Sequence, residues 1–347
     1  MNERIKMAIV GAGTWGEIHG ELYNSSPFSQ CVAICDTNEA RAAAVAERLG
    51  IPQVYGSHLE MLERCQCDAV AVVTPDFLHA KIGVDCVNAK KHLLLEKPLA
   101  TSQADTERLI QAIEANGVRA MVDFHNRWSP PFQETRRAVA AGELGRLVSG
   151  YFRLNDTKWV ATDLLPWAAQ SSILWFLGSH SLDALRWLFN DEASRVYSVS
   201  TSGILKGLGV DTADQYLTTI EFRNGCVAQM ENGWITPNAN PCVNDIKCTL
   251  LGDKGMIAID ASHHNLIQKY TDQSVKVPDV LVSNRVYGQP KGFAYDSILG
   301  FARCLYTGEE FPLTIYDAAN TTLTLLAIMR SAETRLPVDV AGLYGQA

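Results

Sequence analysis

Short apolar runs alternate with amphipathic segments through the first third of the chain. Near-continuous apolar runs are typical of the buried strands of a parallel sheet, and longer amphipathic segments are typical of surface helices. The predicted strands are residues 7–10, 31–35, 54–55, 68–73, 93–95 and 119–124, and the predicted helices include 14–24, 39–49 and 102–116. This βαβ order predicts an α/β fold with a doubly wound parallel sheet and right-handed crossovers.

The pattern changes after Phe124, where hairpin signals replace this alternation. An Asn224-Gly225 turn of the kind that closes two-residue hairpins marks one of them. The hairpin patterns are residues 220–228 and 246–259, and helix patterns follow at 178–190 and 316–332. We therefore expect two domains, with a nucleotide-binding type of sheet in residues 1–122 and a second domain in residues 123–347.

Composition narrows the range of partners. The 347-residue length suits two domains, and the net charge of −8 argues against nucleic-acid and anionic-membrane partners. No apolar run approaches the ~20 residues of a membrane span, and the charged N-terminus has no signal-peptide pattern. The nine cysteines show neither a disulfide framework nor zinc spacing, and His263 and His264 are expected to face solvent without a metal. We predict a cytoplasmic protein with reduced thiols and no metal site.

A glycine-rich turn follows the first predicted strand. The segment Gly11-Ala12-Gly13-Thr14-Trp15-Gly16 matches G-x-G-x-x-G and opens the first helix, the context that a dinucleotide-binding Rossmann fold requires. The first glycine permits the tight turn, the second lets a pyrophosphate approach the backbone, and the third permits close helix–strand packing. The candidate cofactor-binding residues of this turn are Gly11, Gly13, Thr14, Trp15 and Gly16. The alternative is a structural glycine turn.

Asp36, at the end of the second strand, indicates which dinucleotide binds. A carboxylate at this position accepts hydrogen bonds from the adenosine ribose and repels a 2′-phosphate. We therefore predict NAD as the cofactor. NADP is not excluded by the sequence, and Arg41 is nearby within the following helix.

The fifth predicted strand ends in Glu96-Lys97-Pro98. The proline favours an extended backbone at Lys97, so the lysine is presented in a fixed pose at the carboxyl end of a strand. Ligands bind at this edge of open α/β sheets. The sequence therefore predicts a functional lysine here, and the alternative is an ordinary surface lysine.

Three motifs together resemble the Gfo/Idh/MocA family, the group of glucose–fructose oxidoreductase and inositol dehydrogenase. They are the glycine loop extended to Gly16-x-x-His19, the segment Thr74-Pro75-Asp76-Phe77-Leu78-His79 and Glu96-Lys97-Pro98. The resemblance implies a Rossmann domain followed by an α/β domain with an open, mostly antiparallel sheet. It also implies further cofactor-site residues, namely Thr74, Pro75, His79, Glu96 and Lys97.

The family's catalytic helix carries a D-x-G-x-H-x-x-D pattern, to which residues 176–183 correspond. Gly178, His180 and Asp183 match, whereas Phe176 stands in place of the first acid. The resemblance implies that His180 is the general acid/base and that Lys97 hydrogen-bonds the reacting oxygen. A histidine suits this role because its ordinary pKa, near ~6.5, lets it take and return a proton at neutral pH. A satisfied core histidine is the alternative.

The candidate substrate-binding residues are Lys97, Arg127, Trp167, Phe176 and His180. A structural ion pair is the alternative for Arg127, and core packing is the alternative for Trp167. Asp183 is expected either to orient the imidazole or to brace the helix. Phe176 predicts an apolar wall, so the substrate is less polar on that side or meets another acid there, such as Asp156 or Asp163.

These features lead to the expectation of an NAD(H)-dependent oxidoreductase, in which residues 1–122 form the dinucleotide-binding Rossmann domain and residues 123–347 form the substrate-binding and oligomerisation domain. It transfers a hydride between nicotinamide and a hydroxyl or ketone carbon of a sugar, sugar derivative or cyclitol. One alternative is a redox-elimination enzyme of the glycosidase type, and another is a non-catalytic cofactor-binding sensor of the same fold. The expected partners are a small carbohydrate or polyol and further copies of the chain in a homodimer or homotetramer, because an open sheet leaves one face uncovered by helices.

Overall fold

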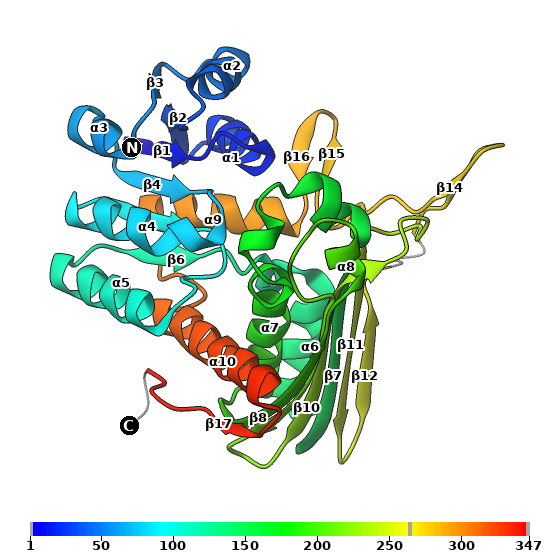
Figure 1. The fold of residues 1–347 in the computed structure, drawn as a ribbon. Helices are drawn as coiled ribbons and strands as arrows, with labels where there is room; N and C mark the ends of the chain where they lie inside the picture. Colours follow the sequence, from blue (N-terminus) through cyan, green and yellow to red (C-terminus); the bar gives the residue numbers. More distant parts are fainter. Residues whose placement is uncertain (1–2, 263–265, 345–347) are drawn as a thin grey trace. The chain divides into compact units, whose positions relative to one another are not determined.

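The computed structural model describes residues 3–262 and 266–344 (Figure 1), so the expectation for His263 and His264 lies outside the described residues. The chain forms two compact units. The first comprises Met1–His125 and Arg285–Ala319, and the second comprises Asn126–Asn284 and Asn320–Ala347. The division of function between residues 1–122 and 123–347 stays a prediction. In the structure the chain changes unit after His125, and residues 285–319 belong to the first unit.

A six-stranded sheet forms the centre of the first unit, in the order β3-β2-β1-β4-β5-β6. Every neighbouring pair is parallel. The strands are β1 (Ile5–Val10), β2 (Ser29–Cys35), β3 (Gln53–Tyr55), β4 (Ala69–Val72), β5 (His92–Leu95) and β6 (Ala120–Val122). The helices are α1 (Thr14–Ser25), α2 (Glu39–Leu49), α3 (His58–Arg64), α4 (His79–Asn88), α5 (Gln103–Asn116) and α9 (Phe293–Thr307), with a 3₁₀ turn η1 (Asp76–Leu78). A second 3₁₀ turn, η2 (His125–Trp128), lies where the chain passes into the second unit. The strand order reverses between β1 and β4, the position next to which open α/β sheets bind ligands.

Local chemistry explains why these elements begin and end where they do. All four residues of β4 are fully buried, which accounts for its unbroken apolar run. Asn38 and Ser102 cap α2 and α5 by accepting hydrogen bonds from backbone N–H groups three residues on. Gly50 and Gly117 end the same helices with φ values of +67° and +62°, a conformation that glycine adopts without strain. The predicted parallel α/β fold of this region is confirmed.

One helix of the first unit comes from far along the chain. Helix α9 packs against α1, β1 and β2. It is fastened at Ser297, whose hydroxyl donates a 2.5 Å hydrogen bond to Asp123 at the end of β6. Neither this helix nor its return to the first sheet was predicted from the sequence.

A seven-stranded sheet organises the second unit, in the order β12-β11-β7-β10-β9-β8-β17. Its strands are β7 (Leu147–Thr157), β8 (Ala193–Thr201), β9 (Gln215–Phe222), β10 (Val227–Thr236), β11 (Asn244–Gly252), β12 (Met256–Asp260) and β17 (Val338–Asp339). Only the β7–β10 pair among them is parallel. The predicted mostly antiparallel sheet and both of its hairpins are therefore confirmed.

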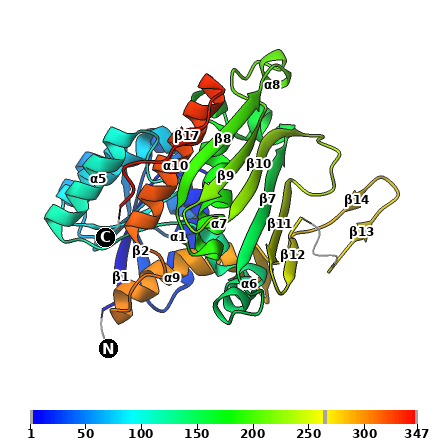
Figure 2. The ribbon, with the colours of Figure 1, turned by 90° about the horizontal axis from the view of Figure 1, so that it is seen from below.

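Helices cover one face of this second sheet. They are α6 (Pro130–Ala140), α7 (Ser179–Phe189) and α10 (Ile315–Thr334), and a short α8 (Ile204–Gly207) lies after β8. Figure 2 shows α6 and α7 against the sheet, where Leu182, Leu185 and Phe152 share one buried cluster. On the strands β8 and β9, by contrast, Tyr197 and Leu217 are exposed. One face of the sheet is therefore covered by helices. Other side chains on its strands are open to solvent.

Several smaller features complete the description. Two-stranded hairpins join β13 (Lys269–Tyr270) to β14 (Val275–Lys276) and β15 (Asn284–Val286) to β16 (Gln289–Lys291). All nine cysteines are buried, and they are present as thiols. Among the described residues, no helix combines the length and the apolar character that crossing a membrane demands.

Candidate active site

The glycine turn between β1 and α1 is shaped by close backbone contacts. Gly11 has φ +110°, and a Cβ on it would lie 2.1 Å from the carbonyl oxygen of Val73. A Cβ on Gly16 would lie 1.9 Å from the carbonyl oxygen of Gly11. Around Gly13 no atom would lie within 4 Å of such a Cβ. Two glycines are therefore required by the fold, and the third leaves open space beside the first turn of α1.

Asp36 lies at the carboxyl end of β2 and is 7 % exposed. Its carboxylate accepts 2.8 Å hydrogen bonds from the backbone N–H groups of Ala12 and Asn38. Arg41 donates to both oxygens, at 2.8 and 2.9 Å. Burial raises the pKa of Asp36, but the bonds from Arg41 and the backbone outweigh it, so the pKa lies below its usual value and the group is ionised at neutral pH.

These groups fit a dinucleotide. Helix α1 has no side-chain cap at Gly13, so its first backbone N–H groups and the positive end of its dipole are suited to a pyrophosphate. The buried hydroxyl oxygen of Thr74, just after β4, has no hydrogen-bond partner among the described residues. Asp36 offers an ionised acceptor for ribose hydroxyls. The predicted cofactor residues from the first, second and fourth strands therefore collect at one edge of the sheet.

The loops after β4 and β5 are held together by His79. Its Nδ1 lies 2.7 Å from the carbonyl oxygen of Pro98, and its Nε2 lies 2.9 Å from that of Thr74. The ring is 1 % exposed. Both loops carry predicted cofactor-site residues. The Lys97–Pro98 peptide bond, in the loop after β5, is cis. In this arrangement His79 shapes the site by joining the two loops.

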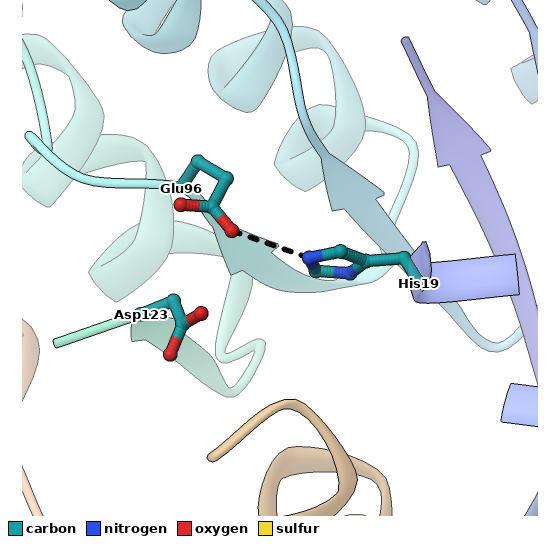
Figure 3. Close-up of side chains that lie close together, drawn as sticks. All are labelled: His19, Glu96 and Asp123. Atoms are coloured by element: carbon teal, nitrogen blue, oxygen red, sulfur yellow. Dashed lines mark hydrogen bonds and ion pairs between the residues drawn. The ribbon is translucent and has the colours of Figure 1, made fainter. Parts of the chain in front are cut away.

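Glu96 is held by two side chains, and Figure 3 shows its contact with one of them, His19. Its Oε1 accepts a 2.7 Å hydrogen bond from the indole N–H of Trp15, in the first turn of α1, and lies 3.2 Å from Nε2 of His19. The other ring nitrogen of His19 lies 3.1 Å from the Tyr23 hydroxyl. Burial raises the pKa of Glu96, but the hydrogen bond and charge of His19 and the charge of Lys97 outweigh it, so the pKa lies below its usual value.

Asp123 lies beside this pair (Figure 3). One nitrogen or oxygen atom from each of His19, Glu96 and Asp123 lies within 4.8 Å of the other two. The hydrogen bonds of His19 to Glu96 and Tyr23 already engage both of its ring nitrogens. We therefore interpret the cluster as a buried hydrogen-bond network. It ties the glycine turn, through Trp15, to the residue that precedes Lys97, and sequence patterns gave no signal for these side-chain contacts.

Lys97 itself is partly exposed at the carboxyl end of β5. The backbone N–H of the preceding Glu96 donates a 3.0 Å hydrogen bond to the carbonyl oxygen of Val72, which extends the β4–β5 ladder to this point. Lys97 is thus held next to an ionised carboxylate and at the sheet edge where the glycine turn lies. This is the geometry that the sequence predicted for a functional lysine.

His180 lies in the second unit, at the start of α7, and is 5 % exposed. A π-helical stretch, η5 (Leu174–Gly178), leads directly into α7, and π-helical turns occur frequently at functional sites. Gly178 permits close packing there, because a Cβ on it would lie 3.3 Å from Oδ1 of Asn232 on β10. The amide of Asn232 donates a 3.0 Å hydrogen bond to the hydroxyl of Ser181, which fixes the first turn of α7 against the sheet.

Family models match both units. The model of an oxidoreductase family with an NAD-binding Rossmann fold, Gfo/Idh/MocA, matches residues 5–124, and the model of the C-terminal domain of the same family matches residues 132–258. The chain belongs to the Gfo/Idh/MocA oxidoreductase family. Its dinucleotide-binding site is therefore an NAD site, as the sequence predicted.

Individual relatives of this Gfo/Idh/MocA protein are distant but span its whole length. A scyllo-inositol 2-dehydrogenase (NAD(+)) of Bacillus subtilis is 27% identical over 98% of this chain and 97% of its own. An uncharacterized oxidoreductase, YrbE, of the same organism is 24% identical over 98% of both chains. The crystal structure of scyllo-inositol dehydrogenase from Lactobacillus casei with bound NAD(H) and scyllo-inositol superposes with a TM-score of 0.83 at 19% identity, covering 98% of this chain and 100% of the other. This last likeness shows the shared fold.

Helix α7 of this Gfo/Idh/MocA protein carries a buried ion pair. Asp183 accepts hydrogen bonds from Nε and a terminal nitrogen of Arg127, at 2.8 and 2.6 Å. The two side chains are 1 % and 5 % exposed. The pair joins η2 to α7, so the contacts of Asp183 support the helix-bracing role. For Arg127 they support the structural alternative over the predicted contact with substrate.

We predict that breaking this pair lowers stability strongly. Arg127→Met leaves the Asp183 carboxylate buried without its counter-charge and should reduce the free energy of unfolding by about 3–5 kcal/mol. Removing both charges in Arg127→Met/Asp183→Leu should cost less than the single change. Urea unfolding followed by circular dichroism measures both.

The control for this prediction is the exposed Arg64–Glu60 pair on α3, whose side chains are 66 % and 42 % exposed. Arg64→Met should change the free energy of unfolding by no more than about 1 kcal/mol. An equally small effect of Arg127→Met would show that the buried pair does not brace the helix.

Phe176, which replaces the family acid, packs with two tryptophans. Its ring centroid lies 6.2 Å from that of Trp167 and 5.8 Å from that of Trp234 on β10. The two alternative acids each accept a hydrogen bond from a neighbouring polar side chain. Asp163 is exposed and accepts a hydrogen bond from Thr162, and Asp156 accepts one from Asn244. Trp234 was not predicted, because its place beside Phe176 depends on the pairing of distant strands.

Proposed function

We propose that this chain is an NAD-dependent dehydrogenase that acts on a hydroxyl-bearing carbon of a sugar, sugar derivative or cyclitol. The observation that carries the proposal is the position of Lys97. It lies at the carboxyl end of β5, next to the buried and ionised Glu96, whose partner Trp15 belongs to the dinucleotide-binding turn. The inositol dehydrogenases among the relatives and structural neighbours support the class of substrate.

Lys97 and His180 have different roles in such a reaction. Bound NAD accepts or returns the hydride. Lys97 donates a hydrogen bond to the reacting oxygen and stabilises the negative charge that develops on it. His180 takes the hydroxyl proton during oxidation and returns it during reduction.

The proposal also includes the assembly and location of the protein. The open side of the second sheet bears Tyr197, Val199 and Leu217, which are 43 %, 38 % and 48 % exposed. Association of two such faces would bury apolar area that is otherwise in water. We propose a cytoplasmic homodimer or homotetramer built in this way.

A direct assay tests the activity. Purified protein is mixed with NAD and each member of a panel of sugars, sugar derivatives and inositols, and NADH absorbance is followed. The proposal expects NADH to form with at least one member. If products appear while no net NADH forms, the redox-elimination alternative replaces the proposal, and an absence of both products and NADH with the whole panel contradicts any dehydrogenase function of this substrate class.

We predict that Asp36 selects NAD over NADP. Asp36→Ser removes the ionised acceptor for the ribose and frees Arg41 to pair with a 2′-phosphate. Since hydrogen bonds to charged groups contribute about 1.5–3 kcal/mol, KM for NAD should rise by about 10- to 100-fold, while kcat/KM with NADP should rise. Steady-state kinetics with both cofactors measures the change.

Glu63→Ser, at an exposed position on α3, serves as the matched control and should leave both cofactor constants unchanged. Unaltered discrimination between NAD and NADP in Asp36→Ser would show that this carboxylate does not contact the ribose.

A further inference from the structure

The rings of Phe176, Trp167 and Trp234 pack together in the second unit and form an aromatic wall. Trp234 is fully buried at its base, whereas Phe176 and Trp167 are only partly buried. Phe176 meets Trp167 edge-to-face at 68° and meets Trp234 at a tilt of 54°. Rings that pack on one another in this way are held in fixed orientations, so the exposed part of the wall is a rigid apolar surface.

The wall is close in sequence and structure to the proposed acid/base. Phe176 precedes His180 by four residues in the continuous run of η5 and α7, so the two side chains emerge about one turn apart on one side of the helix. On β10, Asn232 donates a hydrogen bond to Ser181 and Trp234 packs on Phe176, so both side chains face the run of η5 and α7. The base of the wall and the anchor of the catalytic helix are therefore on the same side of the sheet.

The chemistry of this surface differs from that of a site built for a polyol. A phenylalanine neither donates nor accepts an ordinary hydrogen bond, so a substrate hydroxyl pressed against it loses water without gaining a partner. The C–H groups of a ring, by contrast, pack favourably on aromatic faces.

Resting on the proposed function, we infer that Phe176, Trp167 and Trp234 select a ring substrate with one apolar edge. This is a carbohydrate or cyclitol that carries hydrogen, or an alkyl or ether group, instead of a free hydroxyl near the reacting carbon. Phe176 is the residue that determines this specificity. A fully hydroxylated cyclitol is then a poor substrate of this chain, in contrast to the relatives that are named for inositols.

Matched pairs of substrates test the inference in the wild-type protein. D-Glucose and myo-inositol are each compared with their single-deoxy and mono-O-methyl analogues, and kcat/KM is measured for NAD reduction. At least one analogue is expected to exceed its parent by about 10- to 100-fold, the range over which apolar pockets discriminate. Parity, or preference for the parent in every pair, overturns the inference.

Substitutions of Phe176 test whether this residue causes the preference for the analogue. Phe176→Asn supplies a hydrogen-bonding amide and should abolish or reverse the preference for the analogue, whereas Phe176→Leu keeps the surface apolar and should retain its direction. Thermal unfolding establishes that each variant is folded. A preference that survives in folded Phe176→Asn overturns the role of Phe176, and the wild-type comparison decides the substrate class even if that variant fails to fold.

Failure of the proposed function is separable from failure of this inference. If the wild-type protein reduces NAD with no compound, the proposed dehydrogenase activity is wrong. Calorimetric titration of the NAD-saturated protein with the same pairs then decides the inference alone. Tighter binding of an analogue than of its parent supports an apolar-edge ligand, and equal, weaker or undetectable binding of all analogues overturns it.

Discussion

Replacing Lys97 with methionine should reduce kcat/KM for NAD reduction by about 10²- to 10³-fold, the loss typical of removing one donor that stabilises developing negative charge. Methionine has a similar length and keeps the apolar stem, but it cannot donate to the reacting oxygen. Most of the loss should fall on kcat, because the interaction strengthens as charge develops. Steady-state kinetics with the best panel substrate measures the change.

Two controls separate this chemical role from a structural one. Lys81→Met, at an exposed position on α4, should leave kcat/KM unchanged. Calorimetry should show that Lys97→Met still binds NAD, because the glycine turn and Asp36 are intact. If Lys97→Met retained wild-type kcat, the lysine at the end of β5 would have no part in the chemistry.

Replacing His180 with asparagine should reduce kcat by about 10²- to 10⁴-fold, the usual contribution of a positioned general acid/base. Asparagine retains a hydrogen-bonding side chain of related shape but cannot carry a proton at neutral pH. The limb of the pH profile of kcat/KM that reports the general base should therefore disappear, an effect that loss of packing alone would not produce. Kinetics across a range of pH measures both effects.

His58 provides the matched control, since it is a histidine of the first unit whose Nε2 lies 2.9 Å from Asp85 on α4. His58→Asn should preserve both the rate and the shape of the pH profile. A His180→Asn protein with an unchanged profile would assign the proton transfer to another group and leave His180 as a core residue.

The first sheet could be predicted closely because its signals are local. The run Ala69–Val72 is apolar since the strand is covered on both faces, and the caps at Asn38 and Ser102 act within three residues of themselves. Helix α9 escaped prediction for the opposite reason. Its bond from Ser297 to Asp123 joins residues 174 positions apart, and no local pattern reports such a contact.

The candidate site shows the same division. The glycine turn and Asp36 were identified because a motif of fixed spacing encodes their backbone geometry. The bond from Trp15 to Glu96 and the packing of Trp234 on Phe176 could not be foreseen, because each depends on how separate strands are ordered. Arg127 shows a further limit. The family resemblance marked it for the substrate, with a structural ion pair as the alternative, and its side chain donates hydrogen bonds to Asp183 on α7.

The central claim is that the chain oxidises a carbon bearing a hydroxyl with NAD, using Lys97. The most direct measurement uses the best panel substrate labelled with deuterium at the reacting carbon, with mass spectrometry of the cofactor recovered from wild-type and Lys97→Met protein. The wild type should yield singly deuterated NADH, and Lys97→Met should yield far less in the same time. Recovery of unlabelled NADH, or equal labelling by both proteins, would contradict it.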